Sequence, residues 1–174
     1  ANIPVRLKNT MDPESYGTLI SKEFNEQGIK AIAAKDNITA IKIKSARMLL
    51  AHGFLKKVFE IFEKYETPID MITTSEIAVS LTIDNNNNLA SIIEELEKFS
   101  TVEVDNQQSI ICLVGHSIVR HKETHRLFKV LQDISVRMIS YGGSNNNISI
   151  LVNTKDKIKA LKHLNTYVFE KIEI

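Results

Sequence analysis

The sequence has a single cysteine, almost no net charge and no long apolar run, and each shortage excludes something. Cys112 has no second cysteine to pair with, so an internal disulfide is excluded. The 22 basic and 21 acidic residues leave a formal charge of +1, so no long-range field favours nucleic acid or an anionic membrane. Neither a signal-like segment nor an apolar run long enough to span a bilayer is present. We therefore expect a cytoplasmic protein that binds neither nucleic acid nor a membrane.

The composition is that of an ordinary globular protein. Of the 174 residues, 43% are hydrophobic and 25% are charged, which is enough for one large domain or two small ones. Cys112 lies inside the apolar run Ile110–Val114, and this favours a buried structural thiol over a reactive one.

Residues 37–107 carry a regular succession of strand and helix patterns. Ile38–Lys44 alternates between apolar and polar side chains, as a half-buried strand does. The next segments are predicted as a helix, two strands, a helix and a strand: Gly53–Glu66, Ile69–Thr73, Ile77–Ile83, Leu89–Phe99 and Val102–Val104. This order is the split βαβ arrangement of a ferredoxin-like unit.

The same order begins again after residue 107. A strand, a helix, two strands and a helix are predicted at Ser109–Val114, Glu123–Ile134, Val136–Tyr141, Asn147–Val152 and Asp156–Phe169. The chain therefore contains an internal repeat. The second unit lacks a fourth strand, whereas the early apolar run Ile29–Ala34 has no role in the first unit. We predict an α+β fold of two ferredoxin-like βαββαβ units, the first inserted into the second, which comprises residues 29–36 and 108–174.

The N-terminal residues are predicted to stand outside both units. Ile3–Lys8 alternates like a short strand, and turn-forming residues follow from Asn9 to Gly17. This segment is either a surface strand with a loop or the end of a preceding domain. Residues 21–28 are polar and end in glycine, which is typical of a linker.

Two stretches offer the groups that a free amino acid needs. Met48–Leu55 is predicted as a loop entering a helix, where Gly53, Phe54 and Leu55 would present unpaired N–H groups and the helix dipole to a carboxylate. Gly53 also leaves room for a ligand to approach closely. A simpler interpretation, a loop glycine before a solvated first turn, stays open.

The second stretch, Ile69–Glu76, is predicted as a strand that ends in polar residues. Asp70 faces away from its two apolar neighbours, so its carboxylate could hold an ammonium group. Thr74, Ser75 and Glu76 add further oxygens, although a plain polar turn would look the same. If the two stretches lie side by side, they form a pocket in which both charges of a free amino acid have partners.

Three runs of residues make the chain similar to a known family. They are Met48–Phe59, Ile69–Glu76 and Met138–Glu170, and the Thr-Thr-Ser-Glu ending of the second is specific. On these runs the tandem units resemble ACT domains, and the chain resembles the C-terminal regulatory region of a monofunctional aspartokinase (aspartate kinase) of the lysine-sensitive type. Residues 1–20 are similar to the segment that closes the kinase domain of that family, and would be its remnant.

The resemblance implies a function in feedback inhibition. The full enzyme phosphorylates the β-carboxylate of aspartate from ATP, and this region would bind an end-product amino acid, lysine first, and inhibit the kinase. The implied partners are that amino acid, the chain's own kinase domain and a second copy paired through the ACT units. ATP and Mg would belong to the kinase domain, so neither catalysis nor a cofactor is expected in these residues. The implied effector site comprises Met48, Ala51, Gly53, Phe54, Leu55, Ile69, Asp70, Thr74, Ser75, Glu76 and Ile77.

One position departs from the family pattern. Lysine-sensitive members usually have a serine where this chain has Ala51. Losing one hydrogen bond costs about 1 kcal/mol, which weakens an affinity several-fold without abolishing the site. Ala51 therefore bears on which amino acid is bound more than on whether one is bound.

Two other functions fit a ferredoxin-like order. A structural dimerisation module would pair through its first units without any ligand. An RNA-binding module would stack bases on aromatic side chains of its central strands, but Ile38–Lys44 and Ile110–Val114 contain none. No metal site is predicted, because His121 and His125 lack the third ligand and the glutamate position of a zinc motif.

Overall fold

Two long antiparallel strands run through the body of the computed structural model, which describes residues 3–22, 28–45, 52–121 and 124–170. Strands β3 (Gly28–Lys44) and β6 (Thr101–His116) pair along their length, from Gly28 opposite His116 to Lys44 opposite Thr101. The other strands flank this pair in the order β4-β5-β3-β6-β8-β7. Their bounds are Met71–Thr74 for β4, Ala78–Ile83 for β5, Val136–Ser140 for β7 and Asn147–Asn153 for β8.

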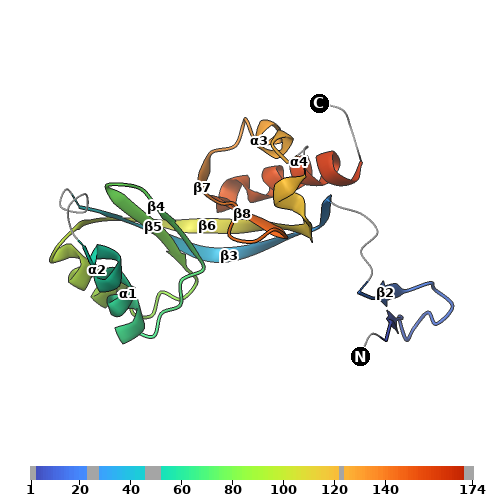
Figure 1. The fold of residues 1–174 in the computed structure, drawn as a ribbon, viewed down its shortest axis with the longest axis horizontal. Coiled ribbons are helices and arrows are strands. Elements are labelled where there is room, and N and C mark those ends of the chain that lie inside the picture. The colour runs from blue at the N-terminus through green and yellow to red at the C-terminus, as the bar shows by residue number, and fades with distance from the viewer. Residues whose placement is uncertain (1–2, 23–27, 46–51, 122–123, 171–174) are drawn as a thin grey trace.

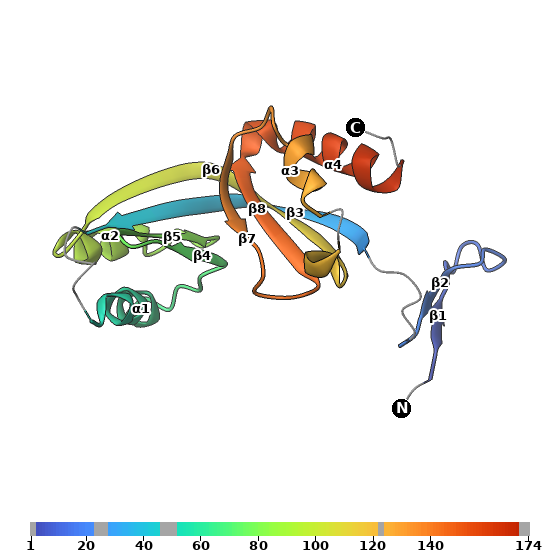
Figure 2. The same ribbon diagram turned by 45° about the horizontal axis from the view of Figure 1, so that its top comes forward.

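The helices lie in two pairs, one for each half of the sheet. Helices α1 (Phe54–Lys64) and α2 (Leu89–Glu97) belong to the first half, and α3 (Arg126–Val130) and α4 (Lys157–Phe169) to the second. Both views place the two pairs at opposite ends of the long strands and on opposite sides of them (Figures 1 and 2). Each pair covers its own hydrophobic core.

Both cores follow from the alternation along the long strands. Ile41 and Ile43 of β3 face α1 and α2, and Ile111 and Leu113 of β6 face α3 and α4, all of them 0–1% exposed. The first core is completed by Phe54, Val58, Ile61, Phe62, Val79, Leu81, Ile83, Ile92 and Leu96. The second is completed by Ile118, Leu127, Leu131, Ile134, Ile148, Ile150, Val152, Ala160 and Leu164.

A third apolar cluster joins the two halves on the sheet face that the helices leave uncovered. The edge strands β4 and β7 come into contact because the sheet curls, and Met71 and Met138 enter this cluster from those edges. Ile38, Ala40, Ile110 and Leu151 make up the rest of it. The two units therefore share a core as well as two strands.

The long strands change units at a pair of matching kinks. Asn37 in β3 has φ 59° and Gln107 in β6 has φ 57°, both left-handed, and the register of the pair shifts between Lys35 and Ala40. Asn tolerates this conformation better than most residues. At these kinks each strand leaves one ferredoxin-like unit and enters the other.

A buried hydroxyl follows each kink and bonds across to the other strand. Thr39 Oγ1 donates to Asn106 Oδ1 at 3.1 Å and accepts from Asn86 Nδ2 at 2.9 Å. Ser109 Oγ donates to Asp36 Oδ1 at 2.7 Å and lies 3.0 Å from Thr154 Oγ1. Thr39 and Ser109 are 1% and 0% exposed, so these bonds give both buried hydroxyls polar partners.

The predicted fold class is confirmed: the chain is α+β, with two ferredoxin-like units and the first inserted into the second. Ile29–Ala34 pairs with the second-unit half of β6, as the count of strands required. The runs predicted as separate strands at 29–34 and 38–44 are one strand, β3, because the kink at Asn37 breaks the alternation without breaking the pairing. For the same reason Val102–Val104 and Ser109–Val114 are one strand, β6.

One local prediction was wrong. The helix predicted over Glu123–Ile134 is only Arg126–Val130, and a run of short turn bonds carries the chain on to Ile134. The turn-forming residues from Asn9 to Gly17 connect β1 (Val5–Leu7) to a strand that was not predicted, β2 (Thr18–Ile20), and the two strands pair. The strand that opens the chain thus finds its partner locally, in a hairpin set apart from the main sheet (Figures 1 and 2).

Replacing Thr39 by valine keeps the shape of the side chain but removes the hydroxyl that Asn106 and Asn86 share. We expect the free energy of unfolding to fall by about 1–3 kcal/mol, because buried polar groups lose a partner. Urea denaturation of Thr39→Val measures this, with Thr101→Val on the exposed start of β6 as the matched control, expected within about 0.5 kcal/mol of wild type. Equal stabilities of the two variants would contradict the role given to Thr39.

Candidate functional site

The predicted helix start is found at the N-terminus of α1. Gly53 adopts φ 86°, a left-handed conformation that favours glycine, and its carbonyl accepts the first helical bond from the N–H of Lys57 at 3.1 Å. Within the described residues no side chain caps this helix start, and its first turn carries no acidic residue. The N–H groups of Phe54 and Leu55 therefore point toward a place where an anion would be stabilised.

The polar strand end is found in the tight turn between β4 and β5. The N–H of Ser75 donates to the carbonyl of Ala78 at 2.8 Å, and its hydroxyl reaches the same oxygen at 3.3 Å. The N–H of Ser45 donates to the carbonyl of Ile77 at 3.2 Å, so the turn lies beside the end of β3, where the chain leaves for α1.

Asp70 lies at the other end of β4. The four residues of β4 lie between it and Ser75, so five residue steps separate the two, a distance of about 16 Å at roughly 3.3 Å per residue. Its N–H donates to the carbonyl of Thr82 at 2.9 Å, and its carboxylate accepts from Lys35 Nζ at 2.8 Å. Lys35 also pairs with Asp84 at 2.7 Å. A carboxylate is present where the sequence predicted one, but it already has a cationic partner.

The predicted site residues thus fall into separate groups within one chain. Phe54 is buried in the first core and Ile69 packs against that core, whereas Leu55 and Ile77 are 38% and 54% exposed. Thr74, Ser75 and Glu76 are exposed at the turn. Met48 and Ala51 lie outside the described residues.

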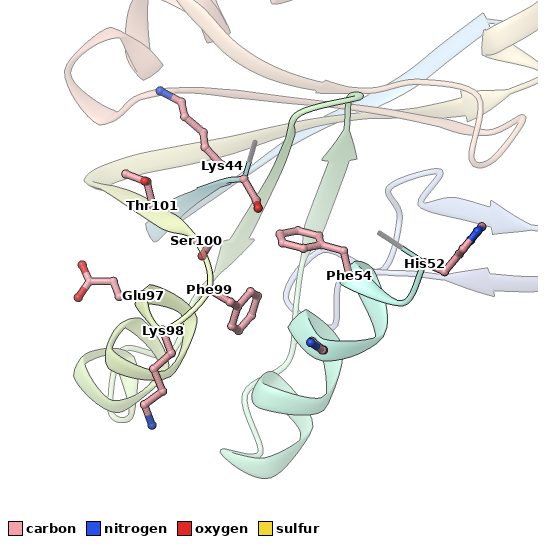
Figure 3. A pocket seen from close by; sticks show the side chains of 10 residues that line it. Lys44, His52, Phe54, Glu97, Lys98, Phe99, Ser100 and Thr101 are labelled. Atoms are coloured by element: carbon pink, nitrogen blue, oxygen red, sulfur yellow. The ribbon is translucent and has the colours of Figure 1, made fainter. Parts of the chain in front are cut away.

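An open groove of about 510 Å³ lies next to the helix start, between α1, the end of α2 and the ends of β3 and β6 (Figure 3). Phe54 and Phe99 form its floor in an edge-to-face contact, with ring centroids 5.8 Å apart. Its lining residues are Lys44, Ser45, His52, Phe54, Lys57, Glu97, Lys98, Phe99, Ser100 and Thr101. Only Phe54 of these was predicted, because the others come from segments far apart in sequence that no single run of residues brings together.

The second unit carries a different chemistry at the position equivalent to Asp70. Asp70 precedes Met71 in the first unit, and Arg137 precedes Met138 in the second, with both methionines in the shared core. Arg137 pairs with Asp105 of β6 at 2.6 Å. An amino acid's ammonium group would meet a cation there, so the two units offer unequal sites.

Ion pairs shift the pKa values of several side chains near the kinks. The hydrogen bonds that Lys35 donates to Asp70 and then to Asp84 raise the pKa of Lys35 above its usual value, and the bond from Lys35 lowers the pKa of Asp84. The bond from Lys157 Nζ at 2.5 Å, and then the Ser109 hydroxyl, hold the pKa of Asp36 below its ordinary value of 3.8. At neutral pH the region is a set of fully charged pairs.

The described residues offer neither a metal-binding cluster nor a membrane-spanning helix. No group of three or more His, Cys, Asp or Glu side chains lies close enough together to hold a metal ion. None of the helices in that part of the chain is long and apolar enough to cross a membrane.

Comparison with known proteins shows which proteins the chain is similar to. The model of the ACT domain family matches residues 111–167. A C-terminal regulatory domain of aspartate kinase from Porphyromonas gingivalis W83 is 49% identical, with a TM-score of 0.73 over 81% of this chain and 98% of that one. Aspartokinase III of E. coli, solved in complex with lysine and aspartate, is 32% identical, with a TM-score of 0.82 over 97% of this chain and 39% of that one.

Curated relatives agree with these structures. The chloroplastic aspartokinase 3 of Arabidopsis thaliana is 38% identical over 97% of this chain. The chain spans about a third of that relative's length (33%). Because this relative is chloroplastic, the cytoplasmic location stays a prediction.

Fold and family model together define a regulatory module built of ACT domains. The chain belongs to the C-terminal regulatory regions of aspartokinases. The family predicted from the three sequence runs is therefore confirmed.

Replacing Asp36 by asparagine tests the charge pair at the kink. A carboxyl whose pKa is lowered on folding stabilises the protein above about pH 4, its unfolded pKa, and this contribution is lost as the pH falls through the folded value. We therefore expect Asp36→Asn to be less stable than wild type at pH 7 and to lose less stability on acidification. Urea denaturation between pH 7 and pH 2 measures both curves.

Lys157→Met is the companion variant for this measurement, because it removes the other partner of the pair. It should flatten the acid limb of the stability curve in the same way as Asp36→Asn. Parallel curves for wild type and both variants would contradict a stabilising pair.

Proposed function

We propose that this chain senses an end-product amino acid, lysine first, and inhibits an aspartokinase to which it belongs. The single observation that carries this proposal is the likeness, over 97% of the chain, to the aspartokinase III that was solved with lysine and aspartate. The phosphorylation of aspartate by ATP and Mg would be the work of the kinase domain. These residues by themselves would bind an effector and catalyse nothing.

The chemistry of the first unit supports an amino-acid ligand. The N–H groups at the start of α1 suit the ligand's carboxylate, and Asp70 suits an ammonium group. Thr74 and Ser75 add hydroxyls at the turn beside the end of β3. We assign the effector to this unit because Arg137 replaces the carboxylate in the second.

Pairing of two copies would reunite the groups that one chain holds apart. If strand β4 of one copy lies antiparallel to β4 of another about a two-fold axis, Asp70 of one copy faces Ser75 of the other. Apolar side chains on this unit are available for such contact: Leu55 is 38%, Phe59 44% and Ile72 36% exposed. We therefore propose a homodimer through the first units, with the effector at the interface.

Inhibition then requires the effector to bind the kinase-off arrangement more tightly than the kinase-on one. For the division of the chain we propose residues 37–107 as the first unit, residues 29–36 with 108–174 as the second, 21–28 as a linker and 1–20 as the end of the kinase domain. The positions of the kinks at Asn37 and Gln107 support these boundaries.

Calorimetric titration of lysine, threonine and methionine into the 174-residue chain tests the proposal. We expect lysine to bind, and Asp70→Asn to weaken its affinity by about tenfold or more, because a hydrogen bond to a charged group contributes about 1.5–3 kcal/mol. Asp133→Asn, an exposed carboxylate ahead of β7, is the matched control and should bind as wild type does.

No detectable binding of any of the three amino acids would contradict the proposal. A chain that sediments as a dimer but binds none of them would instead be a ligand-free dimerisation module. RNA binding at physiological salt would support the alternative of an RNA-binding module.

A further inference from the structure

Lys35 stands at the kink of β3 and binds two carboxylates at once. Its Nζ lies 2.8 Å from Asp70 Oδ1 and 2.7 Å from Asp84 Oδ2. Its side chain is 49% exposed, and those of Asp70 and Asp84 are 25% and 37% exposed. A lysine ammonium is charged throughout the physiological pH range, and the bonds to Asp70 and Asp84 raise the pKa of Lys35 further.

We propose that Lys35 is a specificity-determining residue, an internal ammonium group that occupies Asp70 in the empty site and competes there with the amine of the effector. This inference rests on the proposed function, since it concerns the same carboxylate. It assigns to Lys35 a role that the predicted site did not include.

The charges around Asp70 explain why the competition is real. A carboxylate has enough lone pairs for two ammonium groups, but two unit charges about 4 Å apart repel one another even in water. An arriving amine must therefore displace Lys35 or bind against its field. At the dielectric constant of water this repulsion is worth about fivefold in affinity.

Asp84 makes the displacement possible. It holds Lys35 independently of Asp70, so Lys35 keeps one charged partner after it yields the other. Effector binding then weakens the ion pair between Lys35 and Asp70 but does not leave the ammonium of Lys35 without a charged partner. A ligand that brings no ammonium group to Asp70 gains nothing there and leaves Lys35 in place.

The ion pair between Arg137 and Asp105 shows the same arrangement with its charges exchanged. There the long strand β6 supplies the carboxylate, Asp105, and the edge strand β7 supplies the cation, Arg137. In the pair of Lys35 and Asp70 the cation lies on the long strand β3 and the carboxylate directly before the edge strand β4, so displacement of the cation exposes an ammonium site. Lys35 also lies opposite Ile110 in the second-unit half of the sheet, so its release reports effector binding to that unit.

Calorimetric titration of lysine into Lys35→Met, Lys35→Arg and wild type tests the inference. We expect Lys35→Met to bind lysine about fivefold more tightly than wild type. Lys35→Arg keeps the charge and should stay within about twofold of wild type. Far-UV circular dichroism and a thermal midpoint for each variant show that the fold is intact.

Lys64→Met is the matched control. Lys64 is also a strongly paired surface lysine of the first unit, but its partner is the 22%-exposed Glu95, in an ion pair between α1 and α2. Its removal should leave the affinity for lysine unchanged. A gain shared by Lys64→Met would mean that net charge, and not competition at Asp70, sets the affinity, and would overturn the inference.

The remaining outcomes separate this inference from the function on which it rests. If wild type binds lysine and Lys35→Met binds it equally or more weakly, Lys35 is a purely structural partner and only this inference fails. If neither wild type nor Lys35→Met binds lysine, threonine or methionine, the proposed function fails together with this inference. Binding by Lys35→Met alone would support the competition most strongly.

Discussion

The pairing of β3 with β6 is the constraint on which the rest of the structure depends. One half of each strand lies at the centre of one ferredoxin-like unit, and its other half lies at the centre of the other unit. Neither unit can complete its sheet without a strand that the other unit also uses. The two hydrophobic cores and the shared apolar cluster between them are consequences of this arrangement.

The kinks turn one continuous ladder into two units. Asn37 and Gln107 take left-handed conformations, and each is followed by a buried hydroxyl that bonds across the pair. The charged pairs of Lys35 and Asp36 lie directly before the same kink. A change at the carboxylate of Asp70 is thus only one side chain away from the place where the units meet.

Much of this fold could be predicted from the sequence because it depends on local patterns. The alternation at Ile41 and Ile43 and the repeat of that pattern at Ile111 and Leu113 predicted both units. The missing fourth strand of the second unit predicted the insertion. The continuity of the long strands could not be predicted, since Asn37 and Gln107 break the alternation exactly as a loop does.

The site was predictable only in part, for a related reason. The helix start at Gly53 and the polar turn at Ser75 are runs of neighbouring residues, so their chemistry can be recognised in order along the chain. The pairing of Lys35 with Asp70 joins residues 35 positions apart, and no periodic pattern records it. The groove beside Phe54 and Phe99 is likewise assembled from distant segments.

Native-state hydrogen exchange of the variant Leu81→Ala tests most directly whether the shared strands make the two units one cooperative body. Leu81 lies wholly within the first core, and its truncation should cost about 2–5 kcal/mol. If the units are one cooperative body, the amides of Ile41 and Ile43 in the first unit and of Ile111 and Leu113 in the second lose the same amount of protection. Loss of protection in the first unit alone would contradict it.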